Sequence, residues 1–136
     1  MEPTVLDISW LAVIVAAVVK FLIGWAWYSP PIFGTKWREL NKATADDVRA
    51  NLAPALVVEA IGDLIAAYIL ARFVGHYGFG FGVGILVGFM AWLGFVATVL
   101  AGQIYYELRP RDVAVINGGY WLISLVVMGA ILGVWH

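Results

Sequence analysis

Four apolar segments, each long enough to cross a lipid bilayer, constrain this chain more than any other feature. They occupy residues 8–28, 53–74, 80–106 and 113–135. A helix needs about 20 mostly apolar residues to cross the hydrocarbon core, which is about 30 Å thick. Of the 136 residues, 63% are hydrophobic and 12% are charged, whereas soluble domains average about 25% charged residues. We therefore expect an all-α membrane protein with four transmembrane helices, forming a single domain over residues 1–136.

The polar segment between the first two spans predicts a short amphipathic helix on the cytoplasmic side. Thr44 and Asp47 have the spacing of a capping box, which predicts a helix over about 45–51. Pro54 then falls in the first turn of the second span, where its missing N–H costs least. A continuous kinked helix over 45–74 is the alternative. In both cases the four spans pair as two helical hairpins.

The distribution of Lys and Arg predicts the orientation of these hairpins. The first and third connections hold six basic residues, and only Arg72 lies near the second connection. The six are Lys36, Arg38, Lys42, Arg49, Arg109 and Arg111. Because short cytoplasmic loops are enriched in Lys and Arg, both termini should face outward. Residues 1–7 lack the basic start of a signal peptide, so we expect the first span to be retained.

Composition and motifs exclude several classes of function. A net charge of −1 gives no basic field for nucleic acid. Cys is absent, which removes disulfides, thiolate metal sites and cysteine nucleophiles. The two histidines, His76 and His136, belong to the predicted outer surface, away from the intramembrane carboxylates. Residues 78–82 are rich in glycine but lack the Lys-Ser/Thr of a phosphate loop. We expect no enzyme activity, no metal and no cofactor.

Three ionisable residues lie inside the predicted spans. Lys20 is in the first span, and Glu59 and Asp63 are in the second. A charge at mid-bilayer costs at least about 2.5–3.5 kcal/mol on insertion scales. At a rise of about 1.5 Å per residue, Lys20 falls between the two carboxylates in depth, and carboxylates four residues apart share a helix face. A bridge from Lys20 to Glu59 or Asp63 is therefore expected.

This cluster has three interpretations. The first is a structural ion pair that fixes the packing of the first hairpin. The second starts from two carboxylates facing one lysine: the surplus carboxyl would exchange a proton, because desolvation disfavours its charged form, and such a group serves proton-coupled transport. In the third, one of the residues lies closer to the interface and snorkels to it.

Gln103, Asn117 and Tyr120 form a second polar set at about the depth of Glu59. Interhelical hydrogen bonds that only stabilise packing are one interpretation. The other is a polar cavity, open to the cytoplasm, lined by these three residues and Glu59.

Glycines recur at four-residue spacing in the last two spans. Gly80, Gly84 and Gly88 lie in the third span, and Gly129 and Gly133 lie in the fourth. Small residues at this spacing let helix backbones approach closely. They could pack the third span on the fourth, which is the safer expectation, or one protomer on another.

Several motifs resemble one bacterial membrane family. Residues 24–30 (GWAWYSP), followed by Phe33-Gly34 and Trp37, are similar to its signature, as are residues 92–98, 116–120 and 128–133. The family is catalogued as domain of unknown function 1761. The resemblance implies a four-helix bacterial inner-membrane protein and supplies no activity.

The sequence thus leaves two functions open. One is a small proton- or ion-linked transporter or channel that works as a homo-oligomer, with the site set Lys20, Glu59, Asp63, Gln103, Asn117 and Tyr120. The other is a non-transporting accessory or scaffold protein in which the Lys/Glu/Asp cluster is structural. The expected partners are the lipid bilayer, further copies of the chain and an unidentified small solute or ion.

Overall fold

A computed structural model describes residues 8–136, and within that range it contains helices and no strands. Four helical segments are long and apolar enough to span a membrane, which confirms the predicted fold class. They are α1 (Trp10–Trp27), α4 (Leu52–His76), the segment Phe81–Tyr105 and α7 (Arg111–Val134). Residues 1–7, on which the expectation of a retained first span rests, lie outside the described residues.

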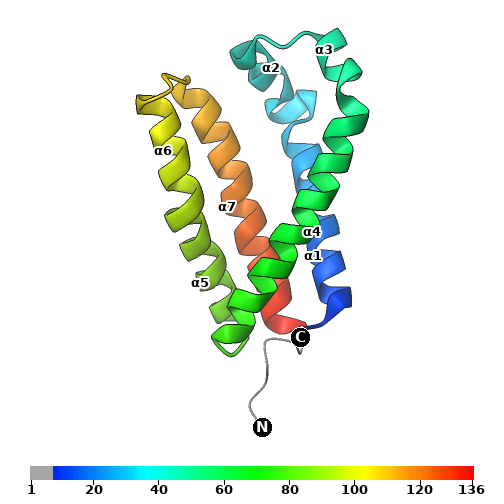
Figure 1. Cartoon of the computed structure of the whole chain (residues 1–136), viewed down its shortest axis with the longest axis vertical. Helices are drawn as coiled ribbons and strands as arrows, with labels where there is room; N and C mark the ends of the chain where they lie inside the picture. Colours follow the sequence, from blue (N-terminus) through cyan, green and yellow to red (C-terminus); the bar gives the residue numbers. More distant parts are fainter. Residues whose placement is uncertain (1–7) are drawn as a thin grey trace.

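The four spans form two hairpins, and α7, the last span, lies at the centre in contact with the other three (Figure 1). α1 packs on α4, α5 packs closely on α7, and α7 also contacts both α1 and α4. The first and third connections lie at one end of the bundle, and the α4–α5 turn and the C-terminus lie at the other (Figure 1). The two basic connections therefore share one side, as the charge pattern predicts.

The first connection is more helical than the sequence suggests. A π-helical turn, η1 (Pro30–Gly34), follows α1 and continues into α2 (Thr35–Asn41). Proline is tolerated at the start of a helix because the first N–H groups have no intrahelical partner. α1 itself ends at Trp27, ahead of Pro30-Pro31, and the two prolines begin the next helical turn.

The predicted short helix is present as α3 (Ala45–Ala50). Its capping box is formed in both directions, with Thr44 Oγ1 accepting from the backbone N–H of Asp47 and the Asp47 carboxylate accepting from that of Thr44, each at 3.0 Å. Asn51 separates α3 from α4, so two helices stand here and the single kinked helix is wrong. Pro54 is in the first turn of α4, as expected.

The third span consists of α5 (Phe81–Ala91), the π-helical segment η2 (Trp92–Ala97) and α6 (Thr98–Tyr105). Its glycines pack it on α7. A Cβ on Gly84 would collide with the backbone carbonyl of Gly129, and a Cβ on Gly133 with that of Gly80. The intramolecular interpretation of the glycine pattern is confirmed. Residues 78–80 form the α4–α5 turn, with positive φ at all three positions.

The apolar core lies in the half of the bundle near the α4–α5 turn. Apolar side chains from α1, α4 and α7, most of them small or branched, fill it: Ala12, Val13, Ala16, Ala17, Ala67, Leu70, Ala71, Val74, Leu125, Met128 and Leu132. The ionisable residues lie above this core, toward the end that carries the first and third connections. The fold therefore places the charged residues Lys20, Glu59 and Asp63 directly next to a tightly packed apolar core.

Candidate functional site

The side chain of Lys20 is enclosed in the bundle. It is 1% exposed, and its ammonium contacts Asp63 Oδ1 at 2.5 Å, Tyr120 Oη at 2.8 Å and Glu59 Oε2 at 3.2 Å. An ammonium carries three N–H donors, and these three acceptors match them one for one. The predicted bridge from Lys20 to Glu59 or Asp63 is confirmed, since the ammonium contacts both carboxylates, and Lys20 is not the residue that snorkels to the interface.

The two carboxylates differ in their access to solvent. The side chain of Asp63 is 2% exposed, whereas that of Glu59 is 43% exposed. Asp63 Oδ2 is buried and has no hydrogen-bond partner among residues 8–136. Asp63 is therefore the enclosed carboxylate of the cluster, and Glu59 is the exposed one.

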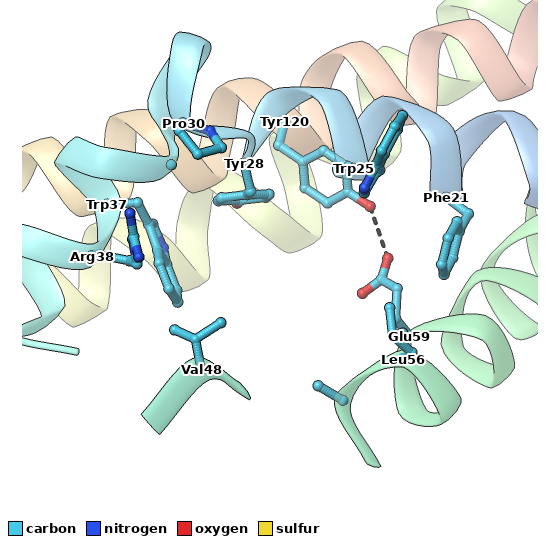
Figure 2. A pocket seen from close by; sticks show the side chains of 13 residues that line it. Phe21, Trp25, Tyr28, Pro30, Trp37, Arg38, Val48, Leu56, Glu59 and Tyr120 are labelled. Atoms are coloured by element: carbon cyan, nitrogen blue, oxygen red, sulfur yellow. Dashed lines mark hydrogen bonds between the residues drawn. The ribbon is translucent and has the colours of Figure 1, made fainter. Parts of the chain in front are cut away.

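Tyr120 on α7 completes the cluster. Its hydroxyl accepts from Lys20 and donates to Glu59 Oε2 at 2.9 Å (Figure 2). Gly24 on α1 makes room for it, since a Cβ there would lie 3.0 Å from Tyr120 Oη. The indole of Trp121 lies under the ammonium, with Nζ 4.1 Å from the ring centroid, and adds a cation–π contact. The ammonium thus contacts two carboxylates, a phenol and an indole face.

Two indoles hold the α7 backbone at this level. Trp27 Nε1 donates to the carbonyl of Ile116, and Trp92 Nε1 donates to the carbonyl of Gly118, both at 2.9 Å. Trp27 comes from α1 and Trp92 from η2, so α7 is fixed from both hairpins just before Tyr120. Neither bond is predicted from the sequence.

Two cavities meet at Glu59. The α1–α4 cavity has a volume of about 500 Å³ and is lined by α1, the first connection and the start of α4. The α6–α7 cavity has a volume of about 550 Å³ and is lined by η2, α6, α7 and the third connection. Glu59, Tyr28 and Tyr120 line both cavities. The phenol of Tyr28 donates to Asn117 Oδ1 at 2.6 Å and packs edge-on against Tyr120, so these two rings stand between the cavities.

The structure separates the six predicted site residues into two groups. Lys20, Asp63, Glu59 and Tyr120 form one hydrogen-bonded cluster. Gln103 and Asn117 do not bond to that cluster, but they line the α6–α7 cavity together with Glu59 and Tyr120. The predicted four-residue lining is therefore found, although Tyr120 belongs to the charged cluster rather than to a separate polar set.

Three further residues at the site were not predicted. Tyr28, Arg109 and Trp121 all line the α6–α7 cavity, and of the three the sequence marks only Arg109, as a charge in the third connection. The adjacency of Trp121 to Tyr120 and of Tyr28 to Trp27 was the only available signal. It does not show which way a ring points.

Among residues 8–136, no group of three His, Cys, Asp or Glu side chains is arranged to hold a metal ion. His76 ends α4, and the ring of His136 stacks on Phe79 in the α4–α5 turn. Both histidines lie at the end of the bundle opposite the two basic connections. The groups at the site are carboxylates, an ammonium, phenols, indoles, the amides of Gln103 and Asn117, and the guanidinium groups of Arg38 and Arg109.

Comparison with known proteins gives one match. The model of the family described as "Protein of unknown function (DUF1761)" matches residues 11–133. No curated protein and no solved structure matches the chain.

Proposed function

Since the chain belongs to the DUF1761 family, whose description assigns no function, we propose from the geometry alone that it is a small proton- or cation-linked transporter. The proposed location is the bacterial inner membrane, with both termini outside and Glu59 as the exchangeable carboxylate. The single observation that carries the proposal is the unequal exposure of two carboxylates that share one lysine.

Charge balance supports this role for Glu59. With both carboxyls ionised, Lys20, Glu59 and Asp63 sum to −1. A net charge in a low-dielectric interior is costly, and one proton or one monovalent cation would neutralise it. The neutralising proton or cation binds at the carboxylate that can be reached from outside the bundle. Asp63 is enclosed, so the exchange takes place at Glu59.

Access to Glu59 from two cavities supports transport over a purely structural pair. A structural pair needs no route for water or solute, whereas a carrier needs a route to its binding group. Tyr28 and Tyr120 stand between the two cavities, and a rotation of either ring would change which cavity opens onto Glu59. Both cavities lie at the end of the bundle that carries the basic connections.

The tightly packed apolar core next to the charged cluster is an argument for a homo-oligomer. The core of α1, α4 and α7 toward the α4–α5 turn is filled by apolar side chains, so one protomer offers no wide path to the opposite end. Association of two copies would supply a pathway along a shared face. In this proposal the partners of the chain are lipid, a second copy and a small solute or ion.

Transport assays in liposomes test the proposal. Glu59→Gln should abolish the proton flux that a proton gradient drives, because the amide cannot exchange a proton. Asp63→Asn should reduce flux through the loss of the fixed pair. Glu107→Gln, a matched change in the exposed third connection, should leave flux unchanged. Flux that is unaltered in both Glu59→Gln and Asp63→Asn would refute the proposal.

The accessory or scaffold alternative makes a separate prediction. If the cluster only fixes packing, the combined variant Lys20→Met, Glu59→Gln and Asp63→Asn should fold and keep the cellular phenotype, since a buried pair can often be replaced at little cost. Full activity in that variant would favour the scaffold over the transporter.

A further inference from the structure

The α1–α4 cavity differs from its neighbour in the character of its walls. Five aromatic side chains line it: Phe21, Trp25, Tyr28, Trp37 and Tyr120. Figure 2 shows Glu59 pointing at the Tyr120 phenol, with its second carboxylate oxygen directed into the cavity. The α6–α7 cavity has four aromatic residues and, in addition, the polar residues Gln103, Asn117 and Arg109. The α1–α4 cavity is thus lined largely by aromatic residues and contains one carboxylate, that of Glu59.

We infer that the α1–α4 cavity binds a lipophilic organic cation, with Glu59 as its counter-ion. The inference rests on the proposed role of Glu59 as the exchangeable carboxylate and names the class of substrate. Aromatic faces and a carboxylate attract the same charge, because the face of a ring carries negative electrostatic potential. A volume of about 500 Å³ lies within the usual range for small-molecule sites, roughly 300–1,000 Å³.

The walls select a cation with a large apolar body. A small hydrated ion gains little from ring faces that offer few oxygen ligands. A quaternary ammonium or phosphonium carries weak hydration and apolar groups, which the rings and Leu56 can cover. Trp25 is 74% exposed and Leu56 is 43% exposed on the outer surface of the bundle. A lipophilic solute can therefore enter from the bilayer between α1 and α4.

Arg38 limits where the positive charge of the ligand can lie. Its side chain lies beside Trp37, across the cavity from Glu59 (Figure 2). The guanidinium repels a cation at that end, so the ligand's charge belongs at the Glu59 end and its apolar body toward Trp37. A zwitterion would use Arg38 as well, and the response to losing Arg38 distinguishes the two ligand classes.

The test uses the purified full-length protein and two probes of matched shape and opposite charge. Tetraphenylphosphonium and tetraphenylborate are titrated by calorimetry and by tryptophan fluorescence. The cation should bind and the anion should not. Glu59→Gln should weaken cation binding by at least about tenfold, because a charge-assisted contact is lost. Trp25→Leu, at a position that is 74% exposed, should weaken it by about threefold. Glu107→Gln should change nothing.

Three outcomes would overturn the inference. Equal binding of both probes would show non-specific partition into the apolar surface. Cation binding that is unchanged in both Glu59→Gln and Trp25→Leu would place the site elsewhere. Weaker binding of an amphiphilic zwitterion in Arg38→Gln, with tetraphenylphosphonium not bound by the parent protein, would reassign the cavity to zwitterions. By contrast, cation-selective binding at Glu59 with proton flux insensitive to Glu59→Gln would refute only the proposed transport function.

Discussion

The pairing of Lys20 with Asp63 should dominate the stability of the first hairpin. At an effective dielectric constant of about 20, unit charges 2.5 Å apart attract by about 7 kcal/mol. The same estimate for Lys20 and Glu59 at 3.2 Å gives about 5 kcal/mol, and solvent reduces this contribution because Glu59 is 43% exposed. Desolvation of the ions offsets most of the gross attraction. The attraction of Lys20 to Asp63 is nevertheless stronger than its attraction to Glu59.

Lys20→Met removes the ammonium at similar side-chain volume and leaves Asp63 buried without a counter-charge. We expect a loss of about 3–5 kcal/mol in the free energy of unfolding, the usual cost of breaking a buried pair. Asp63→Asn should cost less, because Lys20 keeps Glu59 and Tyr120. The double variant should recover about 2 kcal/mol of the summed losses, since neither charge of the buried pair then remains.

Equilibrium unfolding in mixed micelles measures all four corners of this cycle. The surface pair Lys36–Asp112, separated by 3.5 Å with side chains 59% and 60% exposed, provides a matched control. Its cycle, with Lys36→Met and Asp112→Asn, should give a coupling below about 1 kcal/mol. A coupling for Lys20 and Asp63 no larger than that of the surface pair would show that the enclosed ion pair does not hold the hairpin together.

The other predictions concern the framework around the site. Gly84→Ala should destabilise the protein by about 1–3 kcal/mol or more, because its Cβ collides with the facing backbone of α7, whereas Gly94→Ala meets nothing; equal unfolding curves would contradict this packing. Trp92→Phe should cost about 0.5–1.5 kcal/mol through the lost indole hydrogen bond to α7, and hydrogen exchange in α7 that matches the parent protein would argue against the bond. The Thr44 backbone N–H lowers the pKa of Asp47, so the cap of α3 should persist above the ordinary Asp range and disappear only as pH falls through the lowered value. A carboxyl NMR titration with an ordinary midpoint would exclude that hydrogen bond.

Hydropathy located the four spans to within a few residues, because backbone groups in lipid must be satisfied within a helix. It did not locate η1 or η2. η2 contains no proline to mark an irregular turn, and its position follows from packing against α7. The glycine spacing predicted the α5–α7 contact correctly, since only small residues let two helix backbones come so close.

At the site, the sequence predicts the depth of each residue in the membrane but not the rotation of its helix. The depths of Lys20, Glu59 and Asp63 follow from counting residues at a fixed rise, so their meeting could be predicted. The rotation of α4 about its axis could not be read from its sequence, which is apolar on nearly every side. That rotation leaves Asp63 against α1 and α7 and turns Glu59 toward the two cavities. Two carboxylates that are equivalent in the sequence thereby acquire different roles, and the proposals for transport and for cation binding both rest on this difference.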